Sequence, residues 1–200
     1  MMTAALDRLF EILGEPTYRV DRVPWERAEP EAGLRFPLDY KAIIDRYGTF
    51  EIYEYLTVRG PFRGRPQSDM PEGFLGYAAS SRDEAENVLL PENGTEPSPD
   101  GELVTGPDVL LSWGGNIAGD RLFWLLDGEP DNWPIAIWFC GGPWVVVRSG
   151  MAEFLADVVT RRLPEQDNPI PVQGPENPDW TPGEEVPPLL TSLGGWEDAG

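Results

Sequence analysis

The chain has 200 residues, of which 40% are apolar and 11% aromatic, and this is enough for one globular domain with a buried core. Its 35 acidic and 15 basic side chains give a formal charge of −20, which repels nucleic-acid phosphates and anionic lipid headgroups and attracts basic surfaces. We therefore expect no nucleic acid and no membrane among its partners, and a basic protein instead.

The cysteine content and the first residues indicate a reducing compartment. The single cysteine, Cys140, cannot form an intramolecular disulfide and stands in an apolar run that is typical of a buried thiol. Asp7, Arg8 and Glu11 interrupt what would be the apolar core of a signal peptide. The longest uncharged stretch, residues 134–147, is too short to span a bilayer. We expect a cytoplasmic protein.

Two helices are predicted in the first fifty residues. Thr3 caps the first helix and Gly14 stops it. Its apolar residues recur at helical spacing: Leu6, Leu9, Phe10 and Leu13. Pro37 is suited to the first turn of the second helix, which Gly48 ends. The buried stripe of this helix is formed by Tyr40, Ile43, Ile44 and Tyr47. A connector rich in proline and glutamate separates the two.

Residues 50–58 alternate between apolar and polar positions, which predicts one half-buried strand. Its inner face would carry Phe50, Ile52, Leu56 and Val58, and its outer face Glu51, Tyr53, Tyr55 and Thr57. Tyrosines beside a carboxylate are suited to binding a protein, because tyrosine gives a large contact area for little lost entropy. An ordinary half-buried strand is the alternative.

The middle of the chain is predicted to be mostly loop and sheet. Residues 59–73 predict a loop, and residues 74–90 a strand followed by a short acidic helix at about 83–89. Residues 91–107 are rich in turn formers and predict an excursion from the domain. Short apolar runs separated by turn residues then predict the strands of an antiparallel meander: 109–113, 121–126, 134–140 and 144–147.

A final helix and an acidic tail follow the meander. Ser149 is predicted to cap a helix that runs to about Leu163. Residues 164–200 are rich in proline and acidic residues and contain no Lys or Arg, which is typical of an extension that does not fold alone. We therefore divide the chain into a domain, 1–163, and a tail, 164–200. Some apolar tail residues would dock on the domain or on a partner: Trp180, Leu189, Leu190 and Trp196.

The sequence holds no set of residues typical of an enzyme. Without histidine, the Ser-His-Asp, Cys-His and His-containing zinc arrangements are excluded. The Gly114-Gly115 and Gly119 segment precedes a strand instead of opening a helix, so it does not predict a phosphate site, and we expect no cofactor. One carboxylate cluster remains as a candidate: Asp120, Asp127, Glu129 and Asp131. It is interpreted as a solvated hairpin, as a partner-binding acidic loop or, least, as a glycosidase pair.

Tryptophans at predicted strand positions indicate a core more than a stacking platform. They are Trp113, Trp124, Trp138 and Trp144. Trp133 differs, because it lies in a polar Asp-Asn-Trp-Pro turn where we expect it to be only partly covered. The candidate partner-binding residues are thus Glu51, Tyr53, Tyr55, Asp120, Asp127, Glu129, Asp131 and Trp133.

Particular residues in this order resemble the SUKH superfamily of bacterial immunity proteins and fungal cell-wall-assembly regulators. The resemblance covers residues 20–163 and is carried by Trp25 with Leu34-Arg35-Phe36-Pro37-Leu38-Asp39-Tyr40 and Tyr47-Gly48, by Ser112-Trp113-Gly114-Gly115-Asn116 with Gly119-Asp120-Arg121-Leu122-Phe123-Trp124, and by residues 127–134 with the helix around Glu153-Phe154-Leu155. Phe36 stands where leucine is commoner, and residues 91–107 and the tail depart from the pattern.

The resemblance implies an α+β domain with two N-terminal helices, an antiparallel β-meander and a C-terminal helix. It also implies a protein that neutralises a contact-delivered bacterial toxin by stoichiometric binding, without chemistry. Many such toxins are nucleases with basic substrate grooves, which an acidic protein is suited to cover. The alternatives are a cytoplasmic regulatory scaffold or assembly factor that binds an endogenous protein, and an enzyme that uses carboxylates alone. The oligomeric state is left open.

Overall fold

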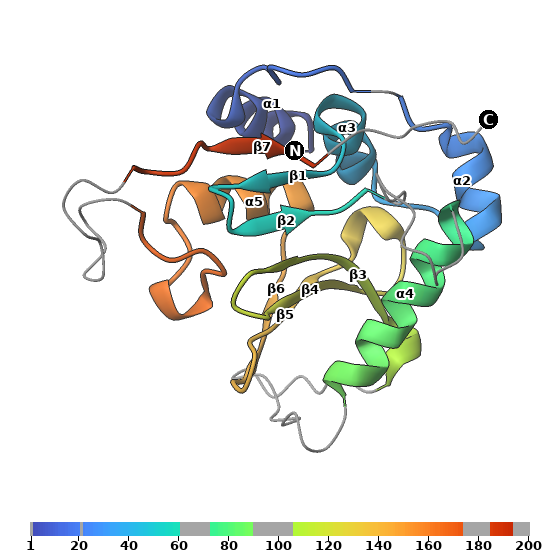
Figure 1. Cartoon of the computed structure of the whole chain (residues 1–200). Coiled ribbons are helices and arrows are strands. Elements are labelled where there is room, and N and C mark those ends of the chain that lie inside the picture. Colours follow the sequence, from blue (N-terminus) through green and yellow to red (C-terminus); the bar gives the residue numbers. More distant parts are fainter. Residues whose placement is uncertain (1, 21, 61–72, 90–105, 174–184, 194–200) are drawn as a thin grey trace.

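The strands that the structure describes form one antiparallel sheet with helices on both faces. The computed structural model describes residues 2–20, 22–60, 73–89, 106–173 and 185–193 (Figure 1). The helices are α1 Met2–Leu13, α2 Trp25–Ala32, α3 Leu38–Tyr47, α4 Gly73–Val88 and α5 Met151–Val159. The strands are β1 Phe50–Ile52, β2 Leu56–Val58, β3 Leu110–Asn116, β4 Arg121–Leu125, β5 Ile135–Trp138, β6 Trp144–Val147 and β7 Leu190–Ser192. The predicted α+β class is confirmed.

The described strands pair in the order β6-β5-β4-β3-β2-β1-β7, so β1 to β6 form a meander and β7 adds an edge beside β1. Helices α1, α3 and α5 cover one face, where they enclose the main core with Phe50, Trp113 and Trp124. Helix α4 packs beside β3 over a smaller apolar cluster on the other face (Figure 1). The alternation of β4 explains this division, because Leu122 and Trp124 belong to the main core and Phe123 to the smaller cluster.

The predicted ends of the first helix and of the Pro37 helix are confirmed at their C-termini. Gly14 and Gly48 have left-handed φ angles of 75° and 65°, and their amides donate to the carbonyls of Phe10 and Ile44. The start of α1 differs, since Thr3 lies inside the helix and does not precede it.

Helix α2 is missing from the sequence prediction. It contains Pro30 and several glutamates, a composition that resembles a connector. Tertiary contacts stabilise this helix, because its intrinsic helix propensity is low. The ring of Trp25 packs on Phe36, and its Nε1 donates to Asp45 over 2.9 Å. Gly33, at φ 70°, ends the helix.

Residues 50–58 form a hairpin, so the prediction of one strand is wrong. Tyr53 and Glu54 occupy a tight turn with φ angles of 55° and 52°, and the amide of Tyr55 donates to the Ile52 carbonyl over 3.1 Å. Glu51 lies opposite Thr57 on the outer face and accepts a hydrogen bond from its hydroxyl. The two tyrosines therefore do not share a strand face with Glu51. Three residues, 53–55, connect the paired Ile52 and Leu56, and the absence of the glycine or asparagine that usually marks such turns conceals this one.

Three further predictions differ from the structure. The acidic helix predicted at about 83–89 is the C-terminal part of helix α4, which begins at Gly73, so the strand predicted before it is wrong. Ser149 does not cap the last helix, which begins after Gly150 and ends at Val159, before Leu163. The predicted loop 59–73 and the excursion 91–107 lie mostly outside the described residues.

Part of the predicted tail packs on the domain. Ile170 is buried in the main core, and Leu189 packs against this core. Leu190 pairs with Ile52 in the register of β7 and β1. Trp180 and Trp196 lie outside the described residues.

A buried carboxylate connects the two central helices of the main core. The side chain of Asp39, in the first turn of α3, accepts the amide of Ala152 in α5 over 3.0 Å and the amide of Tyr40 over 2.7 Å. A Cβ at Gly150 would lie 2.9 Å from the same carboxylate, so glycine permits the approach. Burial raises the pKa of Asp39, although the amide donors oppose this shift. Asp39 thus replaces the missing side-chain cap of α5.

We predict that Glu54→Gly stabilises the protein by about 1 kcal/mol, because a left-handed backbone is strained for any residue with a Cβ. This raises the Tm by about 2–4 °C in thermal unfolding. Glu153→Gly, at another exposed glutamate but inside helix α5, is the control and should lower stability by about 1 kcal/mol. An unchanged or lower Tm for Glu54→Gly would contradict the turn.

We predict that Asp39→Ala lowers the free energy of unfolding by about 2 kcal/mol, because it removes a helix cap and leaves buried amides without an acceptor. Asp39→Asn keeps one acceptor oxygen and should lose less. Urea unfolding at neutral pH compares the two variants. Equal losses would show that the hydrogen bonds of this side chain do not stabilise the fold.

Candidate functional site

The predicted partner-binding residues separate to the two ends of the sheet. In the antiparallel meander, the β1–β2, β3–β4 and β5–β6 turns lie at one end and the β4–β5 connection at the other (Figure 1). Strand β4, about 17 Å long at 3.3 Å per residue, separates Asp120 from Asp127. Tyr53, Tyr55 and Asp120 lie at the turn end; Asp127, Glu129, Asp131 and Trp133 lie at the opposite end; and Glu51 lies between them on the outer face. They do not form one surface.

The residues at the β4–β5 end are tied into the fold. Asp131 accepts the amide of Leu38 over 2.7 Å at the start of α3, and Glu129 pairs with Arg35 over 2.8 Å. Trp133 is only 7% exposed, so the prediction that it is partly covered is wrong. Its indole packs near Trp124 and donates to a turn carbonyl. Asp127 is exposed and has no structural role of this kind among the described residues.

Asp120 is a structural carboxylate. It is 9% exposed and accepts the side-chain amide of Asn116 over 2.6 Å and the backbone amide of Cys140 over 2.9 Å. The same Asn116 amide donates to the Pro169 carbonyl over 2.8 Å. These bonds join the β3–β4 turn, the β5–β6 turn and the segment after α5. Cys140 itself is exposed, which corrects the expectation of a buried thiol.

An apolar and aromatic surface remains at the turn end. Ile117, in the β3–β4 turn, is 71% exposed, and its amide donates to the Tyr55 carbonyl over 3.2 Å. Burial, followed by the charge of Asp120, raises the pKa of the Tyr55 phenol. Tyr53 lies in the neighbouring turn and is half-buried. We call Tyr53, Tyr55 and Ile117 the hairpin surface.

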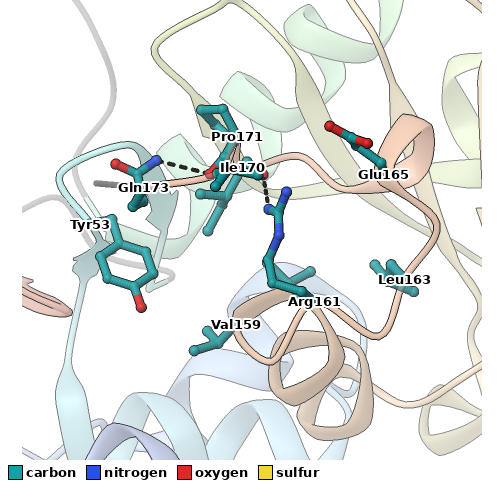
Figure 2. A pocket seen from close by; sticks show the side chains of 10 residues that line it. Tyr53, Val159, Arg161, Leu163, Glu165, Ile170, Pro171 and Gln173 are labelled. Atoms are coloured by element: carbon teal, nitrogen blue, oxygen red, sulfur yellow. Dashed lines mark hydrogen bonds between the residues drawn. The ribbon is translucent and has the colours of Figure 1, made fainter. Parts of the chain in front are cut away.

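A pocket of about 440 Å³ adjoins the hairpin surface at Tyr53. Figure 2 shows the Tyr53 ring on one side of it and the Arg161 side chain on the other, with Val159 between them. The Arg161 guanidinium donates to the Ile170 carbonyl, and the Gln173 amide donates to Pro171 (Figure 2). The pocket thus combines an aromatic ring, a cation and apolar walls. The sequence contains no motif for it, because its walls come from a turn, a helix end and the predicted tail.

A second polar cluster lies on the other face of the sheet and holds α4 in place. Arg59 forms two hydrogen bonds of 2.9 Å to Glu84, and Ser112 donates to the same carboxylate. Arg121 lies 3.7 Å from Glu84. Burial is the largest single influence on the pKa of Glu84 and raises it, but the hydrogen bonds and charges of these three residues together lower it. Because each group has partners, we interpret the cluster as structural.

Among the described residues, no group of histidine, cysteine and carboxylate side chains could hold a metal ion. None of the helices in the described part of the chain has both the length and the apolar character needed to cross a bilayer. Comparisons of the chain with protein-family models, with curated proteins and with solved structures give no match.

The lowered pKa of Glu84 predicts a pH-dependent contribution to stability. The ionised carboxylate stabilises the fold above its unfolded pKa, near 4.5, and this stabilisation is lost as the pH falls through the lower folded value. We expect Glu84→Gln to cost about 2 kcal/mol at pH 7 and clearly less at pH 3. Glu86→Gln, which breaks an exposed pair with Arg82 on the same helix, is the control and should cost much less at either pH. A cost that is equal at both pH values would contradict the cluster.

Proposed function

We propose that the protein is an immunity protein of the SUKH type, which neutralises a toxin domain by stoichiometric binding. The observation that carries the proposal is the hairpin surface, where an isoleucine that is 71% exposed is hydrogen-bonded through its amide to Tyr55, in the turn that also contains Tyr53, on a protein of charge −20. Tyrosine and exposed apolar residues are typical of the buried centre of a protein interface. The acidic chain around them suits a basic partner.

The order of the elements supports this family. Helices α1 and α3, the meander β1 to β6 and the closing helix α5 follow one another as the resemblance implies. Four aromatic residues of the motifs are core residues: Tyr40 packs on Trp124 at 4.8 Å between ring centroids, and Trp113 packs on Phe154 at 5.9 Å. They therefore support the fold and leave the choice of partner to the surface. Helices α2 and α4 and strand β7 are additions to the pattern.

Binding would proceed in two physical stages. The negative charge speeds the encounter with a basic toxin, such as a nuclease with a positive substrate groove. The hairpin surface then becomes buried and sets the lifetime of the complex, because buried apolar and aromatic contacts slow dissociation. The exposed carboxylates contribute to the first stage. Glu129 and Asp131 at the β4–β5 end are among them, because they remain exposed to solvent although each has a partner in the fold.

The test is co-expression with the toxin encoded beside this gene, followed by calorimetry on the purified pair. We expect rescue of growth, one-to-one binding, and an association rate that falls as salt rises. Ile117→Ser should weaken binding at least tenfold, which is about 1.4 kcal/mol, with an unchanged Tm because the side chain is exposed.

Leu38→Ser is the matched control, since Leu38 is 48% exposed at the opposite end of the sheet. If Leu38→Ser weakens binding and Ile117→Ser does not, the assigned surface is wrong. If the neighbouring gene encodes no toxin, or its toxicity persists, the proposed function is wrong, and the cytoplasmic regulatory scaffold becomes the better interpretation.

A further inference from the structure

The described residues include three non-glycine residues with left-handed φ angles: Tyr53, Glu54 and Arg161. Such backbone is unfavourable for residues with a Cβ, and residues strained in this way cluster at functional sites. Two of the three, Tyr53 and Arg161, line the same pocket although they are distant in sequence (Figure 2). Backbone strain and the pocket therefore coincide at Tyr53 and Arg161.

Both positions are ones where the backbone favours another residue. The amide of Arg161 donates to Val158 over 3.3 Å and that of Arg162 to Asp157 over 2.9 Å, so Arg161 occupies the helix-ending position that glycine usually takes. Tyr53 is the first of the three residues between the paired Ile52 and Leu56, and at its φ of 55° glycine or asparagine is usual. Tyrosine and arginine are instead the residue types that dominate binding hot spots.

The chemistry of the pocket favours a neutral ring as its ligand. The lining carries one cation, Arg161, and one carboxylate, Glu165, so a charged side chain of either sign meets a like charge there. A neutral aromatic ring avoids both repulsions, and it can stack on the guanidinium and pair with the Tyr53 ring. Val158, Val159 and Ile170 supply apolar walls. The volume, about 440 Å³, lies in the lower part of the range for small-ligand sites.

We propose that this pocket binds one aromatic side chain of the protein partner, stacked on Arg161 and packed against Tyr53. That the ring comes from a toxin rests on the proposed function, whereas the preference for a ring rests on the pocket alone. Tyr53 belongs to both the pocket and the hairpin surface, so the ring would anchor the partner at the edge of the same interface.

The pocket is tested without a partner by an NMR titration of the full chain with N-acetyl-L-tryptophanamide. We expect millimolar binding, with amide shifts at Val159, Arg161 and Leu163, and no shifts with N-acetyl-L-alaninamide or with sodium acetate. Tyr53→Asn and Arg161→Gly should each weaken binding of the probe at least fivefold. Because Tyr53 also packs against the main core and Arg161 donates to the Ile170 carbonyl, the Tm of each variant is measured beside the affinity. Weaker binding by variants that remain folded separates a binding role from a structural one.

Glu54→Gly is the matched control, because Glu54 shares the left-handed turn but does not line the pocket. It should raise the Tm and leave binding of the probe unchanged. The proposal is wrong if the tryptophan probe causes no shifts, if acetate shifts the same amides, or if folded Tyr53→Asn and Arg161→Gly bind the probe as tightly as the unchanged protein does.

The toxin provides the second measurement. We expect Tyr53→Asn and Arg161→Gly each to weaken its binding at least tenfold. Unchanged affinity would overturn the pocket as an anchor while the proposed function stood. Binding of the probe without any toxin binding would overturn the proposed function while the preference of the pocket for a ring stood.

Discussion

The main core depends on one buried carboxylate. Asp39 accepts a hydrogen bond from the amide of Ala152 and so fixes the start of α5 against the start of α3. These two helices cover the centre of the sheet. The contact has a steric condition, since any side chain at Gly150 would meet the carboxylate. The packing of Tyr40 on one side and Phe154 on the other follows from this placement. An acidic residue here acts as a structural connection, although the chain is so acidic that its charge alone suggests a surface role.

The same use of carboxylates recurs elsewhere and changes the meaning of the net charge. Asp131 caps α3, Asp120 joins two turns, and Glu84 holds α4 through Arg59. These groups lie at different ends and faces of the sheet, so the charge of −20 does not form one functional patch. The features that stand out for binding are instead apolar and aromatic, at Ile117 and its neighbours. Under the proposed function, the field of the whole chain would attract a basic partner, and the local apolar and aromatic contacts would select it.

Periodicity in the sequence predicts the elements with strong patterns: α1, α3, α5 and the meander β3 to β6. It fails where tertiary contacts override composition. Helix α2 forms around Pro30 because Trp25 is held by Asp45, and the β1–β2 turn forms without glycine or asparagine. The site is harder to predict than the fold. Trp133 lies in a polar sequence yet packs in the core, and the pocket joins Tyr53 to Arg161, which share no motif.

The edge pairing of β1 with β7 has a kinetic consequence. Within the meander, each strand pairs with the next strand along the chain. In the pairing of β1 with β7, by contrast, Phe50 lies opposite Ser192 from the far end of the described chain. Closing such a long loop has a larger entropic cost and is slower than forming a local hairpin. The free hydrogen-bonding edge of β1 is therefore among the last parts of the sheet to find its partner strand during folding. Until then it is an open strand edge, the feature through which folding intermediates commonly aggregate.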